Sequence, residues 1–235
     1  MLNPEGRVIM VSGASRGIGR AVAERLTQSG FKVSAGLRSA GAAPKIPGLR
    51  AYHYDATHHD SATSWVAETL RDFGRIDGLV NSAGISIRLP LIDSDQSELF
   101  GTMDQMMLVN LKAPMALIRA AWPHLISCGE GRVVNISSLS GKRIRTEYIA
   151  YAMSKFGLMA LNQEIRRIGW AHGIRATAIC PGMVNTDMHL KLPDPQKKEI
   201  TQPEDLAELV EVALRLPNSA SVGEILVNWQ FEAQA

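Results

Sequence analysis

The sequence predicts an α/β fold, a single doubly wound domain in which a parallel sheet of about seven strands carries helices on both faces. Short β-branched runs alternate with longer segments of helical period, which is the pattern of repeated βαβ units. Residues 8–11, Val-Ile-Met-Val, are wholly apolar, as expected for a buried strand. The length of 235 residues suits one large domain, and no linker or internal repeat divides it. We therefore treat residues 1–235 as one domain.

The elements follow in chain order from this alternation. Expected strands cover residues 8–11, 31–36, 50–54, 76–81, 131–137, 174–180 and 224–227. Expected helices cover residues 18–30, 61–73, 96–126, 151–172 and 203–216. Pro114 predicts a kink or break near Ala113. The breaker-rich residues 40–48 predict a short or absent helix between the second and third strands.

Composition excludes several classes of protein. The 25 Lys and Arg side chains oppose 23 Asp and Glu, and a net charge of +2 provides no field for nucleic acid. No apolar run approaches the roughly 18 residues that a membrane span needs, and the six histidines lack metal-ligand spacing. Cys128 and Cys180 do not suggest a disulfide framework, and the N-terminal residues lack the pattern of a signal peptide. We expect a cytoplasmic protein without metal, nucleic-acid or membrane partners.

The first strand-to-helix turn contains Gly13, Gly17 and Gly19. Glycines tolerate positive φ in a tight turn, and their missing side chains let a phosphate approach main-chain N–H groups at the helix N-terminus. The spacing Gly-x-x-x-Gly-x-Gly departs from the common dinucleotide fingerprint, and no P-loop lysine follows. An anion is expected here, the alternative being glycines that only end the strand.

The end of the second strand bears on the choice of cofactor. An Asp or Glu at this place usually binds the ribose of NAD, but this strand ends at Leu37 with no acid and is followed by Arg38. Arg16 supplies a second cation inside the glycine turn. Arginine forms charge-assisted, often bidentate bonds to phosphate, so the pair favours the 2′-phosphate of NADP over NAD. The alternative is two solvated arginines.

A second group of residues has the types needed for acid–base chemistry. Tyr151 and Lys155 are four residues apart and share one helix face, so the ammonium can lie near the phenol and is expected to favour phenolate. Isolated pairs of this kind are usually ordinary surface pairs. Ser138 follows a strand 13 residues before the tyrosine (151 − 138), and its hydroxyl can reach the same cleft.

Taken together, these motifs resemble the short-chain dehydrogenase/reductase family, which has a single-domain Rossmann fold. The series comprises the glycine turn, Asn81-Ser82-Ala83-Gly84, Asn110, Ser138, Tyr151-Ala152-Met153-Ser154-Lys155 and Pro181-Gly182. The resemblance runs from residue 6 to about residue 227. Ser12 and Ser82 replace a threonine and an asparagine of the family pattern, and each keeps a hydrogen-bonding group.

The resemblance implies a role for each site residue. Tyr151 is the expected proton donor and acceptor, Lys155 lowers its pKa and holds the nicotinamide ribose, Ser138 binds the reacting oxygen, and Asn110 positions a water. The implied catalytic set is Asn110, Ser138, Tyr151 and Lys155. The implied cofactor contacts are Gly13, Ser15, Arg16, Gly17, Ile18, Gly19, Arg38, Asp55, Ala56, Asn81, Ala83, Gly84, Tyr151, Lys155, Pro181, Gly182, Val184 and Thr186.

The expected function is the NADP(H)-dependent interconversion of a carbonyl and a secondary alcohol. A non-catalytic NADP-binding sensor and a nucleotide-fold methyltransferase are the alternatives, although the latter has no use for Tyr151 and Lys155. The expected substrate is a 3-oxo or 3-hydroxy acid, followed by a 3-oxoacyl thioester and then a sugar or polyol. The segments expected to line its pocket are residues 86–93, 139–149 and the loop 183–200, with basic Lys142, Arg143 and Arg145 and apolar Met183, Met188 and Leu190.

The resemblance also implies self-association. In this family two long helices form the contacts between subunits. The corresponding helices here are expected near residues 96–126 and 151–172, so a homotetramer or a homodimer is expected. Trp229 and Phe231 could cover such an interface or pack on their own sheet. The C-terminal end resembles the serine and 3-hydroxy acid dehydrogenase branch.

Overall fold

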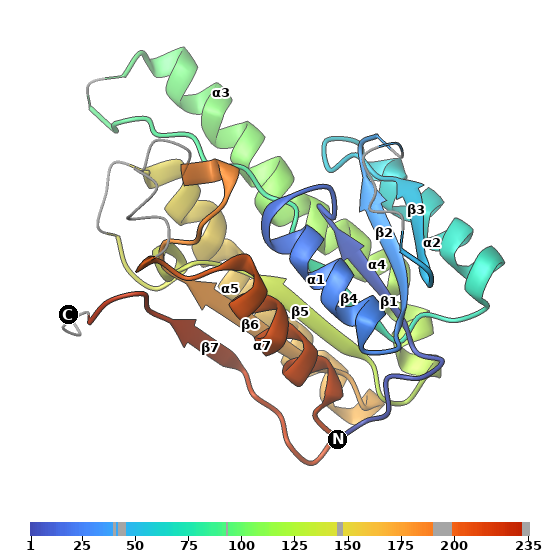
Figure 1. The fold of residues 1–235 in the computed structure, drawn as a ribbon. Helices are drawn as coiled ribbons and strands as arrows, with labels where there is room; N and C mark the ends of the chain where they lie inside the picture. The colour runs from blue at the N-terminus through green and yellow to red at the C-terminus, as the bar shows by residue number, and fades with distance from the viewer. Residues whose placement is uncertain (40, 42–45, 93, 145–147, 190–198, 232–235) are drawn as a thin grey trace.

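The computed structural model shows one seven-stranded parallel sheet, and it describes residues 1–39, 41, 46–92, 94–144, 148–189 and 199–231 (Figure 1). The strand order is β3-β2-β1-β4-β5-β6-β7. The strands are β1 (Val8–Ser12), β2 (Lys32–Leu37), β3 (Leu49–His53), β4 (Gly78–Asn81), β5 (Arg132–Ile136), β6 (Arg175–Pro181) and β7 (Glu224–Val227). The prediction of seven parallel strands is confirmed, with ends that move by one or two residues.

Helices cover both faces of this sheet (Figure 1). Helices α1 (Gly17–Gln28) and α7 (Pro203–Arg215) pack side by side over one face, and their apolar side chains form one core with the strands. The opposite face carries α2 (His59–Phe73), α4 (Ala113–Ser127) and α5 (Ile149–Gly169), which form a second core. All five residues of β1 and of β5 are buried, since cores on both faces exclude water from the central strands.

The predicted helix over residues 96–126 consists of two helices. Helix α3 (Gln96–Met107) passes through a π-turn, η2 (Leu108–Lys112), into α4. Pro114 lies in the first turn of α4, and the change from π-turn to α-helix at Ala113 coincides with the position predicted for a kink or break, while the backbone stays helical on both sides. Pro123 lies inside α4 without ending it.

The remaining short elements complete the connections. They are the 3₁₀ turns η3 (Leu139–Gly141), η4 (Trp170–His172) and η5 (Asp187–His189). Helix α5 begins at Ile149, two residues before the predicted start. Most of the segment expected to lack a helix between β2 and β3, residues 40 and 42–45, lies outside the described residues.

The strand order places a ligand crevice. From the centre of the sheet, β1, β2 and β3 follow one another toward one edge. Strands β4, β5, β6 and β7 follow one another toward the other edge. The order therefore reverses between β1 and β4, and in open parallel sheets ligands bind outside the carboxyl ends of the strands at such a point. Ser12 ends β1 and Asn81 ends β4 at this position.

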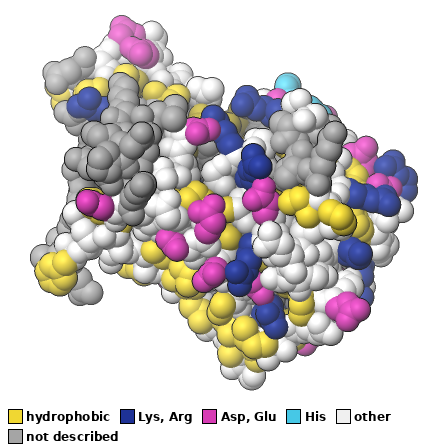
Figure 2. Space-filling view, viewed as in Figure 1, with side chains coloured by type: hydrophobic (Ala, Val, Ile, Leu, Met, Phe, Trp, Pro, Cys, Tyr) yellow, Lys and Arg dark blue, Asp and Glu magenta, His cyan; other side chains and the backbone are white. Residues whose placement is uncertain are grey.

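Some expectations concern properties outside the sheet. Cys128 and Cys180 are both free thiols. No helix in the described part of the chain combines the length and the apolar character that a membrane crossing requires. Acidic and basic side chains lie interspersed over much of the face shown in Figure 2.

Candidate active site

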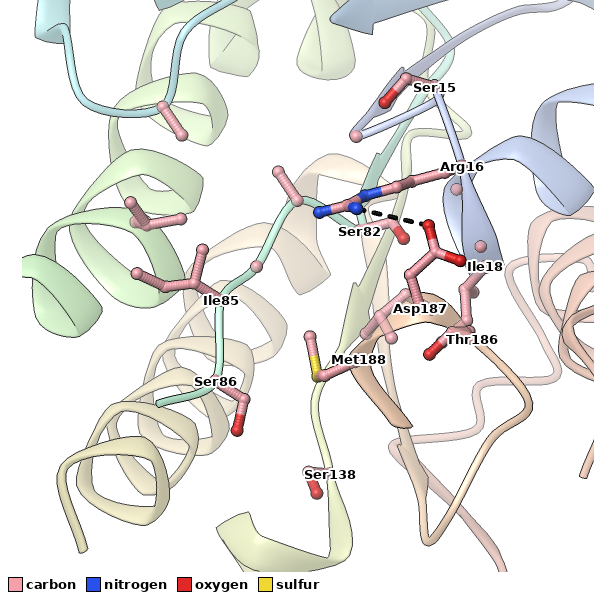
Figure 3. A pocket seen from close by; sticks show the side chains of 18 of the residues that line it. Ser15, Arg16, Ile18, Ser82, Ile85, Ser86, Ser138, Thr186, Asp187 and Met188 are labelled. Atoms are coloured by element: carbon pink, nitrogen blue, oxygen red, sulfur yellow. Dashed lines mark hydrogen bonds and ion pairs between the residues drawn. The ribbon is translucent and has the colours of Figure 1, made fainter. Parts of the chain in front are cut away.

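A cleft of about 580 Å³ opens where the strand order reverses, between β1 and β4. It extends from the turn after β1 and the end of β2, past the segment after β4, to α5 and the segment after β6 (Figure 3). Of the implied site residues, the lining includes Gly13, Ser15, Arg16, Gly17, Ile18, Gly19, Arg38, Asp55, Ala56, Ala83, Gly84, Ser138, Tyr151, Lys155, Pro181, Gly182, Val184 and Thr186. Asn81 and Asn110 are the two implied residues that do not line it.

The glycine turn lines the cleft, and side chains on its glycines would collide with neighbouring residues. Gly13 has φ of +70°, and a β-carbon there would lie 2.8 Å from Ala83 Cα. A β-carbon on Gly19 would collide with the Gly13 carbonyl, and one on Gly17, with φ of +54°, would meet Thr186 at 3.2 Å. Each glycine therefore permits either a left-handed conformation or a close approach of main-chain segments.

The N-terminus of α1 faces the cleft immediately after this turn. Gly17, Ile18 and Gly19 are its first residues, and its first turn contains no acidic side chain. Main-chain N–H groups at a helix N-terminus have no partner within the helix, and the helix dipole favours negative charge there. The turn thus has the donors and the field of a phosphate site.

The opposite end of the cleft, beyond β2 and β3, contains Arg38 and Asp55. The main-chain N–H of Thr57 donates to Asp55 Oδ1 at 2.9 Å and its hydroxyl donates at 2.8 Å. The main-chain bond is the largest cause that lowers the pKa of Asp55, and Arg38 adds a smaller electrostatic effect. Asp55 is therefore a fixed carboxylate beside a guanidinium.

The acid–base pair lies on the first turns of α5. Tyr151 and Lys155 both line the cleft, and Ser138, 8% exposed, faces them from the end of β5. The Ser138 hydroxyl accepts from the main-chain N–H of Ser140 at 3.1 Å and lies close enough to Tyr151 to influence the pKa of its phenol. Lys155 Nζ donates to the carbonyl of Ile136 at 2.9 Å and lies 5.5 Å from the centre of the Tyr151 ring. The structure thus brings together the three groups that the sequence singled out.

The predicted lowering of the Tyr151 pKa beside Lys155 is wrong, because burial is the largest influence on this group and raises its pKa. Burial raises the pKa of Tyr151 to about 12, and the Ser138 hydroxyl opposes this rise. Burial also lowers the pKa of Lys155 to about 8. The reason is geometric, because the ammonium donates to the Ile136 carbonyl and desolvation dominates the titration of both groups. Tyr151 is consequently a protonated phenol at neutral pH.

Asn110 does not line the cleft but holds Ile85, which does. It is buried in the π-turn η2, and its Oδ1 accepts from the N–H of Ile85 while its Nδ2 donates to the Ile85 carbonyl, both at 2.9 Å. The Nδ2 also donates to Ser154 Oγ of α5 at 3.0 Å. Asn110 therefore joins the segment after β4 to the catalytic helix, and its role in placing a water stays a prediction.

Asn81 lies beneath the floor of the cleft, where it is 3% exposed. Its Nδ2 donates to Asn135 Oδ1 at 2.9 Å, and the Nδ2 of Asn135 donates to Asn162 Oδ1 at 3.0 Å. Asn162 continues the chain to the Gly223 carbonyl at 3.1 Å. The Asn81 amide nitrogen is thus committed to a buried amide chain that links β4, β5 and α5, while its Oδ1 is a buried acceptor without a hydrogen-bond partner among the described residues.

A comparison with known families decides what this arrangement is. The family model described as short chain dehydrogenase matches residues 7–197, which is most of the chain. The chain belongs to the short-chain dehydrogenases. The predicted family and the Rossmann-like fold are both confirmed.

Relatives of this short-chain dehydrogenase are named as oxidoreductases. The agropine synthesis reductase of Rhizobium rhizogenes is 36% identical over 220 residues, which are 92% of this chain but 50% of that protein. The chain therefore spans half the length of that relative. An uncharacterized oxidoreductase of Staphylococcus saprophyticus is 31% identical and covers 97% of this chain and 99% of its own. The acetoacetyl-CoA reductase of Rhizobium meliloti is 32% identical and covers 80% of this chain and 78% of its own.

Solved structures of other oxidoreductases share the fold. A metagenomic short-chain oxidoreductase in complex with NADP superposes with a TM-score of 0.80 at 29% identity, covering 96% of this chain and 98% of that one. The alcohol dehydrogenase of Thermococcus sibiricus, complexed with 5-hydroxy-NADP, has a TM-score of 0.86 at 25% identity, covering 97% and 99%.

Several cleft residues of this dehydrogenase were not singled out from the sequence. Gln105 and Val109 reach the cleft from α3 and the π-turn, and Tyr54 and Thr57 line its far end. Asp187 follows Thr186 and bonds to Arg16 at 3.3 Å, so the two predicted arginines do not act as a matched pair in this structure. Ser137, the neighbour of Ser138, also lines the cleft.

Of the basic side chains expected near the substrate, Lys142 forms an ion pair and Arg145 lies outside the described residues. Lys142 Nζ donates to Glu224 Oε2 at 2.7 Å, so its charge is matched. Asp93, Arg145 and Leu190, together with residues 146, 147 and 191–198, lie outside the described residues. Met188 lines the cleft, and Trp229 packs against Gly182 at its edge, whereas Phe231 is 94% exposed. No cluster of three or more metal-ligating side chains occurs within the described residues.

Proposed function

We propose that this short-chain dehydrogenase is an NADP(H)-dependent oxidoreductase that interconverts a carbonyl group and a secondary alcohol. The observation that carries the proposal is the convergence of Ser138, Tyr151 and Lys155 on one cleft that is also lined by a glycine turn at a helix N-terminus. Proton transfer and phosphate binding are thereby available in one continuous cavity. The NADP complexes of solved relatives support the choice of cofactor.

The cleft residues fit a phosphorylated dinucleotide. A β-carbon on Gly13 or Gly17 would occupy space in the turn beside the cleft. The first turn of α1 offers main-chain N–H donors and has no acidic side chain to repel a phosphate. Arg38 follows β2, where no acidic residue is present to receive a ribose hydroxyl. These residues would hold the pyrophosphate and the adenosine 2′-phosphate. When bound, NADPH supplies the hydride that is transferred to the carbonyl carbon.

The chain's own groups handle the oxygen of the substrate. Tyr151, whose pKa is about 12, carries its proton at neutral pH and donates it to the carbonyl oxygen during reduction. Ser138 donates a hydrogen bond to the same oxygen and stabilises the negative charge that develops there. Lys155, with a pKa of about 8, is mostly charged at neutral pH and stabilises the phenolate left behind.

We infer that the substrate is a 3-oxo or 3-hydroxy acid or the corresponding acyl thioester. The named activity of the acetoacetyl-CoA reductase relative supports a 3-oxoacyl thioester, and the C-terminal resemblance to the serine and 3-hydroxy acid dehydrogenase branch supports an acid. The described residues that line the cleft together with Ser138 include the polar Ser86 and the apolar Met188 (Figure 3).

A panel of carbonyl and alcohol substrates, read by the absorbance of NADPH, tests this function. The proposal expects NADPH oxidation with 3-oxo acids or 3-oxoacyl thioesters. Tight NADPH binding without turnover on any member of the panel would favour a cofactor sensor. Binding of S-adenosylmethionine in place of NADPH would favour a methyltransferase.

We further propose that the protein associates through α4 and α5, as a homotetramer or a homodimer. Met115 on α4 and Met153 and Phe156 on α5 are exposed apolar side chains. Apolar residues grouped on neighbouring helices are typical of subunit interfaces. Light scattering measures the stoichiometry, and a monomer at micromolar concentration would contradict the proposal. A cytoplasmic location stays a prediction from the sequence.

A further inference from the structure

One ion pair bridges the cleft. Arg16 Nη1 lies 3.3 Å from Asp187 Oδ2, and the two residues are 171 positions apart in the sequence. Figure 3 shows the Arg16 side chain extending over the cleft, with the carboxylate of Asp187 just below it. The main chains are already close, because a β-carbon on Gly17 would lie 3.2 Å from Thr186 Cγ2. The pair therefore joins the glycine turn to the segment after β6.

The two partners are free to exchange this contact for another. Their side chains are 71% and 51% exposed, and exposed ion pairs contribute little to stability because water screens both charges. Arg16 is the N-cap residue of α1, and its side chain makes no capping hydrogen bond. Its guanidinium is thus held across the cleft by the carboxylate of Asp187 alone among the hydrogen bonds and ion pairs of the described residues.

The Nη1 group of Arg16, which bonds Asp187, is not free to bond a phosphate at the same time, whereas Nε and Nη2 keep their donors. The planar fork of arginine engages one oxyanion bidentately, and a phosphate with nearly two charges is a stronger partner than an exposed carboxylate. If Arg16 turns its Nη1 edge to the 2′-phosphate of NADPH, the bond to Asp187 must break. NADH has no 2′-phosphate, so its binding leaves the bond intact.

We propose that Asp187 sets the cofactor selectivity of this enzyme by competing with the 2′-phosphate of NADPH for the guanidinium of Arg16. Asp187 is a positioning residue, since it acts through Arg16. The inference rests on the proposed NADP(H)-dependent function. Its consequence is a selectivity for NADPH that is lower than Arg16 and Arg38 together would otherwise provide.

Dissociation constants for NADPH and NADH, measured by quenching of protein fluorescence, test the competition. Asp187→Asn should lower the NADPH constant about two- to fivefold, the range that an exposed ion pair spans, and leave the NADH constant unchanged. Asp187→Glu keeps the charge and should restore the wild-type ratio of the two constants. Glu24→Gln is the matched control, because Glu24 accepts from Arg20 on α1 at 2.8 Å, in an ion pair of comparable exposure that does not line the cleft.

A double variant separates competition from simple repulsion between Asp187 and the cofactor phosphates. In an Arg16→Gln background, Asp187→Asn should leave the ratio of the two constants unchanged. The same two- to fivefold change in that background would overturn the proposal, as would an equal change for NADPH and NADH or no change at all in the single variant. Failure of the wild-type protein to bind NADPH would instead overturn the proposed function, and this inference with it.

Discussion

Lys155 offers a test that measures both the stability of the fold and catalysis. Its side chain is 5% exposed, and burial lowers its pKa from 10.5 to about 8. Between these two values the unfolded chain binds a proton that the folded chain has released. The free energy of unfolding therefore rises with pH through this window, because stability increases wherever the unfolded state binds more protons.

The magnitude follows from the difference between the two pKa values. Linkage gives a gain of about 2 kcal/mol in unfolding free energy from Lys155 alone between pH 7 and about pH 9.5. Lys155→Met removes this titration and keeps a side chain of similar length. The wild-type protein should thus gain about 2 kcal/mol relative to the variant over this pH range, while the other titrating groups contribute equally to both.

Urea unfolding at the two pH values measures this difference directly. The variant is also expected to lose NADPH-dependent turnover at both values, since the cation beside Tyr151 is gone. A pH dependence of unfolding that is identical in the two proteins would show that Lys155 is not desolvated as the structure indicates. Turnover retained in the variant would show that the ammonium does not support proton transfer.

Two more substitutions test separate parts of the account. Arg38→Ala should raise the dissociation constant of NADPH far more than that of NADH, and equal changes measured by fluorescence would remove the 2′-phosphate argument. Gly36→Ala places a methyl group 2.5 Å from the Trp65 ring, and the overpacking should lower the unfolding free energy by about 1–3 kcal/mol in urea; an unchanged midpoint would contradict the close contact of β2 with α2.

Local sequence patterns were sufficient for the sheet and for the catalytic helix. Strand β1 is an apolar run apart from its last residue, and Pro114 indicated a change in the helix near Ala113 because proline acts on its immediate neighbours. The four-residue spacing of Tyr151 and Lys155 likewise determines that they share a helix face.

Contacts between distant segments were beyond such reasoning. Asp187 meets Arg16 across 171 positions, and Asn81 turns to Asn135 across 54, so no periodicity links the partners. The π-turn before α4 also has no composition signal, since its geometry depends on the bonds of Asn110 to Ile85. The direction of the Tyr151 pKa was mispredicted because burial and the orientation of Lys155 are properties of the packed structure.

The turnover number of Tyr151→Phe, measured at saturating NADPH together with the dissociation constant of NADPH, tests the central claim most directly. The phenol is assigned as the proton donor, and general acid catalysis is worth about 10²–10⁴ in rate. The account predicts a loss of turnover in that range with NADPH affinity nearly unchanged. Turnover equal to that of the wild-type protein would show that Tyr151 does not donate the proton.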